Sequence, residues 1–157
     1  MTPNLKSRHL RASHREHGFS LVEVLIALII MSVGMLGIAS LYVQSMQAGR
    51  TSMFYHQAVT LAGDVADRIR ANPLARDAYE GAGGAQGCVS TGNCDEDEMA
   101  ANDIAVWTDQ ATTSLPSGQV TIAFADLEPP EYTITVDWDE PGDNDPSYEI
   151  KIPVLDQ

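Results

Sequence analysis

The chain has 157 residues, of which 44% are hydrophobic and 20% are charged, and its formal net charge is −13 at pH 7. This length, with one apolar stretch of membrane length, leaves room for a single further domain of ordinary size. Beyond Arg76 the only basic residue is Lys151. So acidic a segment repels phosphate backbones, which argues against direct nucleic-acid binding.

Residues 19–43 form an apolar stretch with one ionisable side chain, Glu23. About 25 residues at about 1.5 Å each can cross a hydrocarbon core of about 30 Å. The leader before the stretch is basic, and such leaders stay on the cytoplasmic side. It carries Lys6, Arg8, Arg11 and Arg15 against Glu16. The pattern predicts a transmembrane helix with a cytoplasmic N-terminus.

Gly18 and Glu23 make this stretch unusual. A secretory signal has its small-residue cleavage site after the apolar run, whereas Gly18 precedes it. Cleavage there would remove the leader and keep the helix. A carboxylate inside a membrane helix costs a few kcal/mol, so Glu23 is a functional candidate. Alternatively, it reaches the headgroups and is tolerated. After cleavage, the amine of Phe19 from another helix could pair with it.

Residues 18–23, GFSLVE, follow a short basic leader and precede a long apolar helix. In this combination they resemble the class III signal of type IV prepilins. The resemblance implies that prepilin peptidase, a membrane aspartyl protease, cuts after Gly18 and methylates the new amine of Phe19. It also implies that Glu23 helps the subunit to enter a growing filament.

The helix is expected to continue beyond the apolar stretch, to about Ala71. One apolar stripe recurs at helical spacing, on Phe54, Ala58, Leu61, Val65 and Ile69. Asp64 and Arg68 are a supporting pair one turn apart, and Pro73 ends the pattern. A stripe of this kind predicts a packing face against a domain.

Residues 74–94 look like a flexible connector, because the glycines of GAGGAQG miss the dinucleotide-binding pattern. Cys88 and Cys94 are the only cysteines and would face an oxidising compartment, which favours a disulfide. Free thiols or half of a zinc site are the alternatives. Zinc needs further ligands, and His56 is the sole histidine outside the leader, so no metal site is expected.

A second helix is predicted to begin after Asp95, the N-cap, with Glu98 in capping-box position. The four consecutive acidic residues 95–98 are better explained as a solvated helix start than as a metal site. The core-facing positions are Ile104, Trp107, Ala111 and Leu115, before residues 116–118 end the helix.

Three strands follow, each with apolar residues at alternate positions. The apolar positions are Val120, Ile122 and Phe124; Tyr132, Ile134, Val136 and Trp138; and Tyr148, Ile150, Ile152 and Val154. They predict a small antiparallel sheet with one buried face. Packed on the helical stripe, this face gives a two-layer α+β domain.

The sequence favours neither a metal site in the acidic C-terminal region nor a catalytic site elsewhere. The aspartates around Gly142 resemble a calcium loop, but Pro141 occupies the third ligand place and Glu149 falls one residue late. An acidic turn is the simpler explanation. His56 lies on the predicted long helix, with no nearby serine or cysteine at a spacing typical of a catalytic nucleophile. We therefore expect a structural protein without a cofactor, and not an enzyme.

The resemblance extends to most of the chain. Residues 57–73, the cysteine pair, the helix end at 115–118 and the strand at 134–140 are similar to the PilV-type minor pilins, called type IV pilus modification proteins. This implies a type IV pilin-like fold in which the long helix packs on a small antiparallel sheet. The implied domains are a cleaved leader, 1–18, a transmembrane or filament-core helix, 19–43, and a periplasmic domain, 44–157.

In that family the subunit works with other minor pilins, the major pilin and the inner-membrane assembly platform. It starts pilus assembly, then enters the pilus at the cell surface, where motility and adhesion depend on it. A minor pseudopilin of type II secretion shares the leader, Glu23 and the fold, and is the closest alternative. A membrane-anchored binding module or enzyme is another alternative, and it predicts no cleavage after Gly18.

The first prediction concerns processing. We expect cleavage between Gly18 and Phe19, with methylation of the Phe19 amine, because a small residue precedes the apolar helix. Gly18→Arg should leave a longer, uncut precursor. Intact-mass analysis measures both, and a mature protein that still carries residues 1–18 would refute the prediction.

Overall fold

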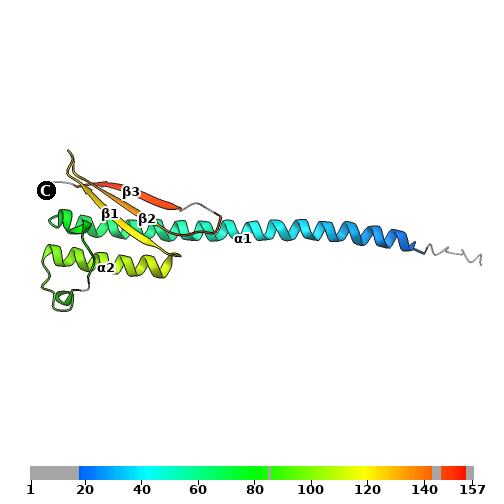
Figure 1. Cartoon of the computed structure of the whole chain (residues 1–157), viewed down its shortest axis with the longest axis horizontal. Coiled ribbons are helices and arrows are strands. Elements are labelled where there is room, and N and C mark those ends of the chain that lie inside the picture. Colours follow the sequence, from blue (N-terminus) through cyan, green and yellow to red (C-terminus); the bar gives the residue numbers. More distant parts are fainter. Residues whose placement is uncertain (1–17, 85, 143–145, 155–157) are drawn as a thin grey trace, which may run out of the picture. The chain divides into compact units, whose positions relative to one another are not determined.

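The computed structural model describes residues 18–84, 86–142 and 146–154. In chain order (Figure 1) the elements are α1 (Leu21–Ala71), the short 3-10 helices η1 (Arg76–Glu80) and η2 (Gly87–Ser90), α2 (Glu96–Ser114), and the strands β1 (Gln119–Ala125), β2 (Glu131–Asp137) and β3 (Ser147–Pro153). The long N-terminal helix packs on a three-stranded antiparallel sheet, which confirms the predicted α+β fold. The chain divides after Gln44 into two compact units.

The first unit is the N-terminal part of α1. Every described residue in it is exposed. α1 contains an 18-residue window with a mean hydropathy of 2.6, so by length and composition it can span a membrane. A helix that is apolar on all sides is suited to lipid or to a protein core and not to water.

The second unit contains the C-terminal part of α1, which buries one stripe. All five predicted stripe residues are buried, as are Ala62 and Ala66 beside them. The two alanines keep this face of α1 narrow, and small side chains let a helix approach its neighbours closely. The predicted packing face is therefore confirmed.

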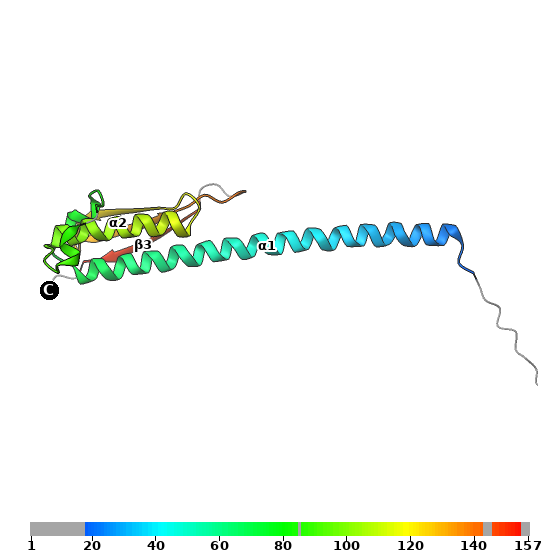
Figure 2. The same ribbon diagram turned by 90° about the horizontal axis from the view of Figure 1, so that it is seen from below.

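The sheet has the strand order β1-β2-β3, with antiparallel pairing throughout. Ile134 of the central strand β2 is in register with Ile122 of β1 and with Ile150 of β3. Alternate residues of β2 are buried, as side chains on opposite faces of a strand require. The sheet lies alongside α1, and α2 lies beside α1 in both views (Figures 1 and 2). The predicted strands are confirmed.

α2 begins with the predicted capping box. Asp95 accepts a hydrogen bond from the N–H of Glu98 at 2.8 Å, and the Glu98 carboxylate accepts one from the N–H of Asp95 at 3.2 Å. At the other end the chain turns sharply against the helix at Gly118. A Cβ at Gly118 would lie 2.3 Å from the carbonyl oxygen of Ala111, so only glycine fits this turn.

The prediction of a flexible connector over residues 74–94 was wrong. η1 and η2 lie within it, and Ala75 and Tyr79 are buried in the core. The ring of Tyr79 stacks on Trp107 of α2 with centroids 5.8 Å apart. Ala75 and Tyr79 stand among small and polar residues in a segment without a periodic apolar pattern, so periodicity did not predict their burial.

Cys88 and Cys94 form a disulfide, as the sequence analysis favoured. The carbonyl oxygen of Cys88 also accepts hydrogen bonds from the N–H groups of Thr91, Gly92 and Asn93, at 3.0, 2.8 and 3.3 Å. Glu98 lies close to both sulfurs. Because both sulfurs are in the disulfide, neither is available as the thiolate that a zinc site requires. Residues 143–145, part of the suggested calcium loop, lie outside the described residues.

We predict that the denatured, unreduced protein has no thiol that reacts with a labelling reagent. Two labels per chain would contradict the disulfide. Replacing both cysteines by serine should lower the free energy of unfolding by about 2 kcal/mol, since the disulfide closes a short loop. Denaturant unfolding measures this, with the reduced wild-type protein as the matched control.

Candidate functional site

The first candidate site is the start of α1. Ser20 caps the helix: its hydroxyl accepts a hydrogen bond from the N–H of Val22 at 3.3 Å, and its carbonyl oxygen accepts one from Val24 at 3.2 Å. Glu23 lies in the first turn, three residues after this cap. Ser-x-x-Glu spacing is typical of helix starts, but this cap was not among the predicted features, because Ser20 also belongs to the signal motif.

The structure brings Phe19 and Glu23 together. Both line one shallow hollow, whose other lining residues are Val24, Ala27, Leu28 and Met31. Phe19 is 80% exposed. Gly18 is exposed as well, with open space around it: a Cβ placed there would meet no atom within 4 Å. The backbone that the resemblance identifies as the cleavage point is therefore accessible within the described part of the chain.

Glu23 is an acceptor without a donor. Among the described residues, no side chain forms an ion pair or a hydrogen bond with its carboxylate. The N-terminal end of a helix favours a negative charge, which suits Glu23 to its place in the first turn. An isolated carboxylate bordered by apolar side chains can bind one cationic donor, and the attraction is strongest where water is excluded. This arrangement fits the recognition of a cationic group.

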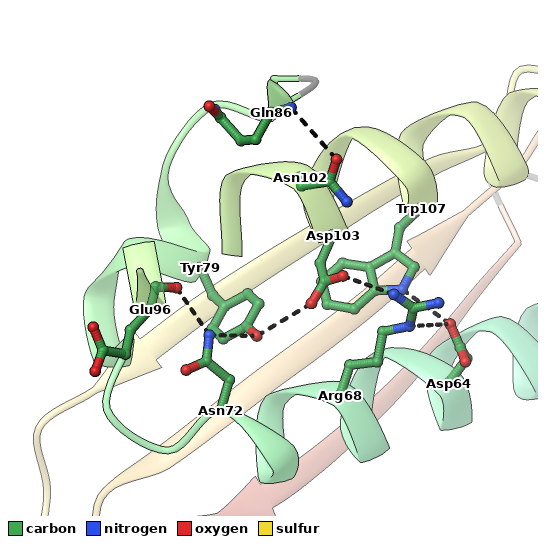
Figure 3. Close-up of polar contacts among 9 residues, drawn as sticks. All are labelled: Asp64, Arg68, Asn72, Tyr79, Gln86, Glu96, Asn102, Asp103 and Trp107. Carbon is green, nitrogen blue, oxygen red and sulfur yellow. Dashed lines mark hydrogen bonds and ion pairs between the residues drawn. The ribbon is translucent and has the colours of Figure 1, made fainter. Parts of the chain in front are cut away.

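The second cluster of polar residues lies between α1 and α2 (Figure 3). Arg68 of α1 forms an ion pair with Asp64 one turn earlier, at 3.4 Å, and a shorter one with Asp103 of α2, at 2.7 Å. Asp103 is only 3% exposed. The hydrogen bond from Arg68 to Asp103 is the main reason why the pKa of Arg68 is raised. A buried carboxylate thus has the charge partner that it requires.

Hydrogen bonds extend this cluster to η1 and to the first residue of α2. The hydroxyl of Tyr79 donates to Asp103 at 3.4 Å, and the indole N–H of Trp107 donates to Asp64 at 3.1 Å. The amide of Asn72 donates to Tyr79 at 3.3 Å and to the Glu96 carbonyl at 2.9 Å. Both oxygens of Asp103 have donors, so the cluster holds α1, η1 and α2 together and leaves no free carboxylate oxygen on Asp103 for acid–base chemistry.

Sequence reasoning identified the pair of Asp64 and Arg68 but missed Asp103. A signal for it was present. Asp103 precedes Trp107 by four residues, and Trp107 precedes Ala111 by four, so all three occupy one face of α2. A carboxylate on an otherwise apolar helix face indicates a buried ion pair.

Tyr79 of this cluster and Tyr132, on which it packs, both have raised pKa values. Burial is the main cause that raises the pKa of both Tyr79 and Tyr132 to about 12. The hydroxyl of each tyrosine donates a hydrogen bond: that of Tyr79 to Asp103, and that of Tyr132 to the carbonyl oxygen of Arg76 at 2.7 Å. An ionised phenolate at either place would lose its donated hydrogen bond and its solvation together.

Comparisons with known protein families gave two matches. Residues 13–39 match the family model described as the prokaryotic N-terminal methylation motif. Residues 40–105 match the one described as type IV pilin Tt1218. A comparison with curated proteins found no match, and neither did a comparison with solved structures.

The raised pKa values of Tyr79 and Tyr132 predict a loss of stability at alkaline pH. Because the folded pKa exceeds the value near 10 of an unfolded chain, the stabilisation is complete below pH 10 and is lost as pH rises towards 12. The tyrosinate absorbance of the wild type minus that of Tyr79→Phe isolates one phenol. A difference signal with its midpoint near pH 10 in the folded protein would contradict the prediction.

Proposed function

Because this chain is a type IV pilin, we propose that it is a minor pilin of the PilV type. It helps to initiate pilus assembly in the inner membrane and is then incorporated into the pilus, where it supports twitching motility and adhesion. The observation that carries the proposal is Glu23: an exposed carboxylate in the first turn of an apolar helix, without a partner among the described residues and five residues after the glycine of a prepilin-type signal.

Processing comes first in this proposal. Prepilin peptidase cuts between Gly18 and Phe19 and methylates the Phe19 amine, so that the apolar part of α1 becomes the N-terminus of the mature subunit. The exposed backbone at Gly18 supports this step. The basic leader supports an orientation with the N-terminus in the cytoplasm and the domain of residues 44–157 in the periplasm.

Assembly follows from the chemistry of Glu23. The amine of a neighbouring pilin remains cationic after methylation and can donate to the carboxylate of Glu23. Each charge alone is costly in apolar surroundings, whereas the pair offsets both costs. A subunit would therefore gain stability when it meets a partner's N-terminus, and this gain selects docking over free diffusion in the membrane.

The charge of the second unit supports a minor role. Residues 45–157 contain 20 Asp and Glu against five Lys and Arg. Copies of so acidic a domain repel one another, which disfavours a filament made mainly of this chain. Partnership with other minor pilins, the major pilin and the assembly platform fits this charge better. The role we propose is structural, because the one buried carboxylate cluster, among the described residues, holds helices together.

We predict that Glu23→Ala is inserted and cleaved normally but assembles poorly, which reduces piliation and twitching. Glu23→Gln keeps the shape and removes the charge, so it should also be impaired. The assay is complementation of a strain that lacks this protein, with immunoblots for abundance and cleavage. Ser32→Ala is the matched control, since it removes a polar group whose hydroxyl donates only within the helix, to the carbonyl of Leu28 at 2.6 Å.

Full motility with either Glu23 variant, at normal abundance, would show that the carboxylate is only a tolerated part of an anchor. Loss of motility with Ser32→Ala as well would point to a general defect in insertion. Pili at wild-type level combined with a secretion defect would favour the pseudopilin alternative.

A further inference from the structure

The three residues after β2 cross from the sheet towards α1, and we call Trp138, Asp139 and Glu140 the strap. Its backbone is fixed at two points. The N–H of Trp138 donates to the carbonyl of Pro146 at 3.2 Å, and that of Asp139 donates to the carbonyl of Pro116 at 2.8 Å. The side chain of Trp138 is 2% exposed. The strap is therefore anchored to the segments before β1 and β3, independently of α1.

Two side chains of α1 meet the strap. The ring of Tyr55 packs edge-on against Trp138, with centroids 5.2 Å apart. The hydroxyl of Thr51 lies within hydrogen-bond distance of two acceptors, the Gln47 carbonyl at 3.2 Å and one carboxylate oxygen of Glu140, which is closer. A hydroxyl has one proton to donate, and the closer, charged acceptor forms the stronger bond. Thr51 therefore bonds to the strap and not to its own helix.

This contact lies where α1 leaves the domain. Within the second unit, residues 45–50 are all exposed; Thr51 is the first half-buried residue and Phe54 the first buried one. The contact is also incompletely satisfied. The second carboxylate oxygen of Glu140 and the indole N–H of Trp138 are buried without a partner among the described atoms. The Asp103 cluster, in contrast, gives both of its carboxylate oxygens a donor.

We propose that the strap is a latch on α1, which fixes the point where the helix leaves the domain and can release while the core from Ala58 onward stays packed. When the bond of Thr51 to Glu140 breaks, the first turn of α1 within the domain, residues 51–54, loses its only polar tie to the strap among the described residues. The next turns stay buried under the sheet and under α2. The length of α1 that is free of the domain thus depends on the bond of Thr51 to Glu140, together with the burial of Phe54 and the packing of Tyr55 on Trp138. This inference does not rest on the proposed function.

Hydrogen exchange measured by mass spectrometry on the full chain in detergent micelles tests the latch. In Thr51→Val, the amides of residues 48–56 should exchange about tenfold faster or more, because a hydrogen bond to a half-buried charge is lost. The amides of residues 61–69 should be unchanged. Thr51→Ser keeps the hydroxyl and should restore slow exchange.

Thr60→Val is the matched control. Thr60 also lies on α1 and donates to the carbonyl four residues earlier, that of His56 at 2.8 Å, but it makes no hydrogen bond to the strap. It should leave residues 48–56 at the wild-type rate. Glu140→Ala removes the acceptor and should speed exchange as Thr51→Val does, and the double variant should be no faster than the faster single variant.

Unchanged exchange in Thr51→Val would refute the latch. Equal acceleration of residues 48–56 and 61–69 would also refute it, since the contact would then belong to the core. Additive effects of the two substitutions would show that Thr51 and Glu140 act separately.

Discussion

One helix has to satisfy two different surroundings, and the rest of the fold depends on how it does so. In its N-terminal unit α1 is apolar on every side, whereas in the second unit only one stripe is apolar. Burial of that stripe is the main favourable term available to a domain of this size. A sheet with one apolar face and a second helix provide the cover. The strand order β1-β2-β3 places each strand beside the next one in the chain, so that short connections complete the apolar face of the sheet.

Apolar burial alone does not fix how α2 lies on α1. The ion pair between Arg68 and Asp103 adds direction, because the Asp103 side chain, which is only 5% exposed, tolerates only placements that keep its donors. Tyr79 brings η1 into the same cluster. A segment without regular repeat is thereby tied to the helices on either side of it. The cluster contributes to the choice of one packing over its alternatives, and the stripe contributes apolar burial.

The sequence was sufficient for elements with a regular repeat and insufficient for contacts between distant residues. The stripe from Phe54 to Ile69, the alternating strands and the capping box at Asp95 could all be predicted, because spacing along the chain dictates them. The burial of Tyr79 could not, since it depends on Trp107, 28 positions later. The contact between Thr51 and Glu140 joins residues 89 positions apart. At the start of α1, Gly18, Phe19 and Glu23 were recognisable as a motif, but the cap at Ser20 was overlooked.

The chain order of the elements has a consequence for how the domain is made. The stripe on α1 ends at Ile69, but the sheet face that covers it is completed only at Ile152. At a synthesis rate of about 5–20 residues per second, the stripe waits on the order of ten seconds for its cover. During that interval an apolar surface is presented to whatever is nearby. The time for which this apolar surface stays uncovered is therefore set by the pace of translation.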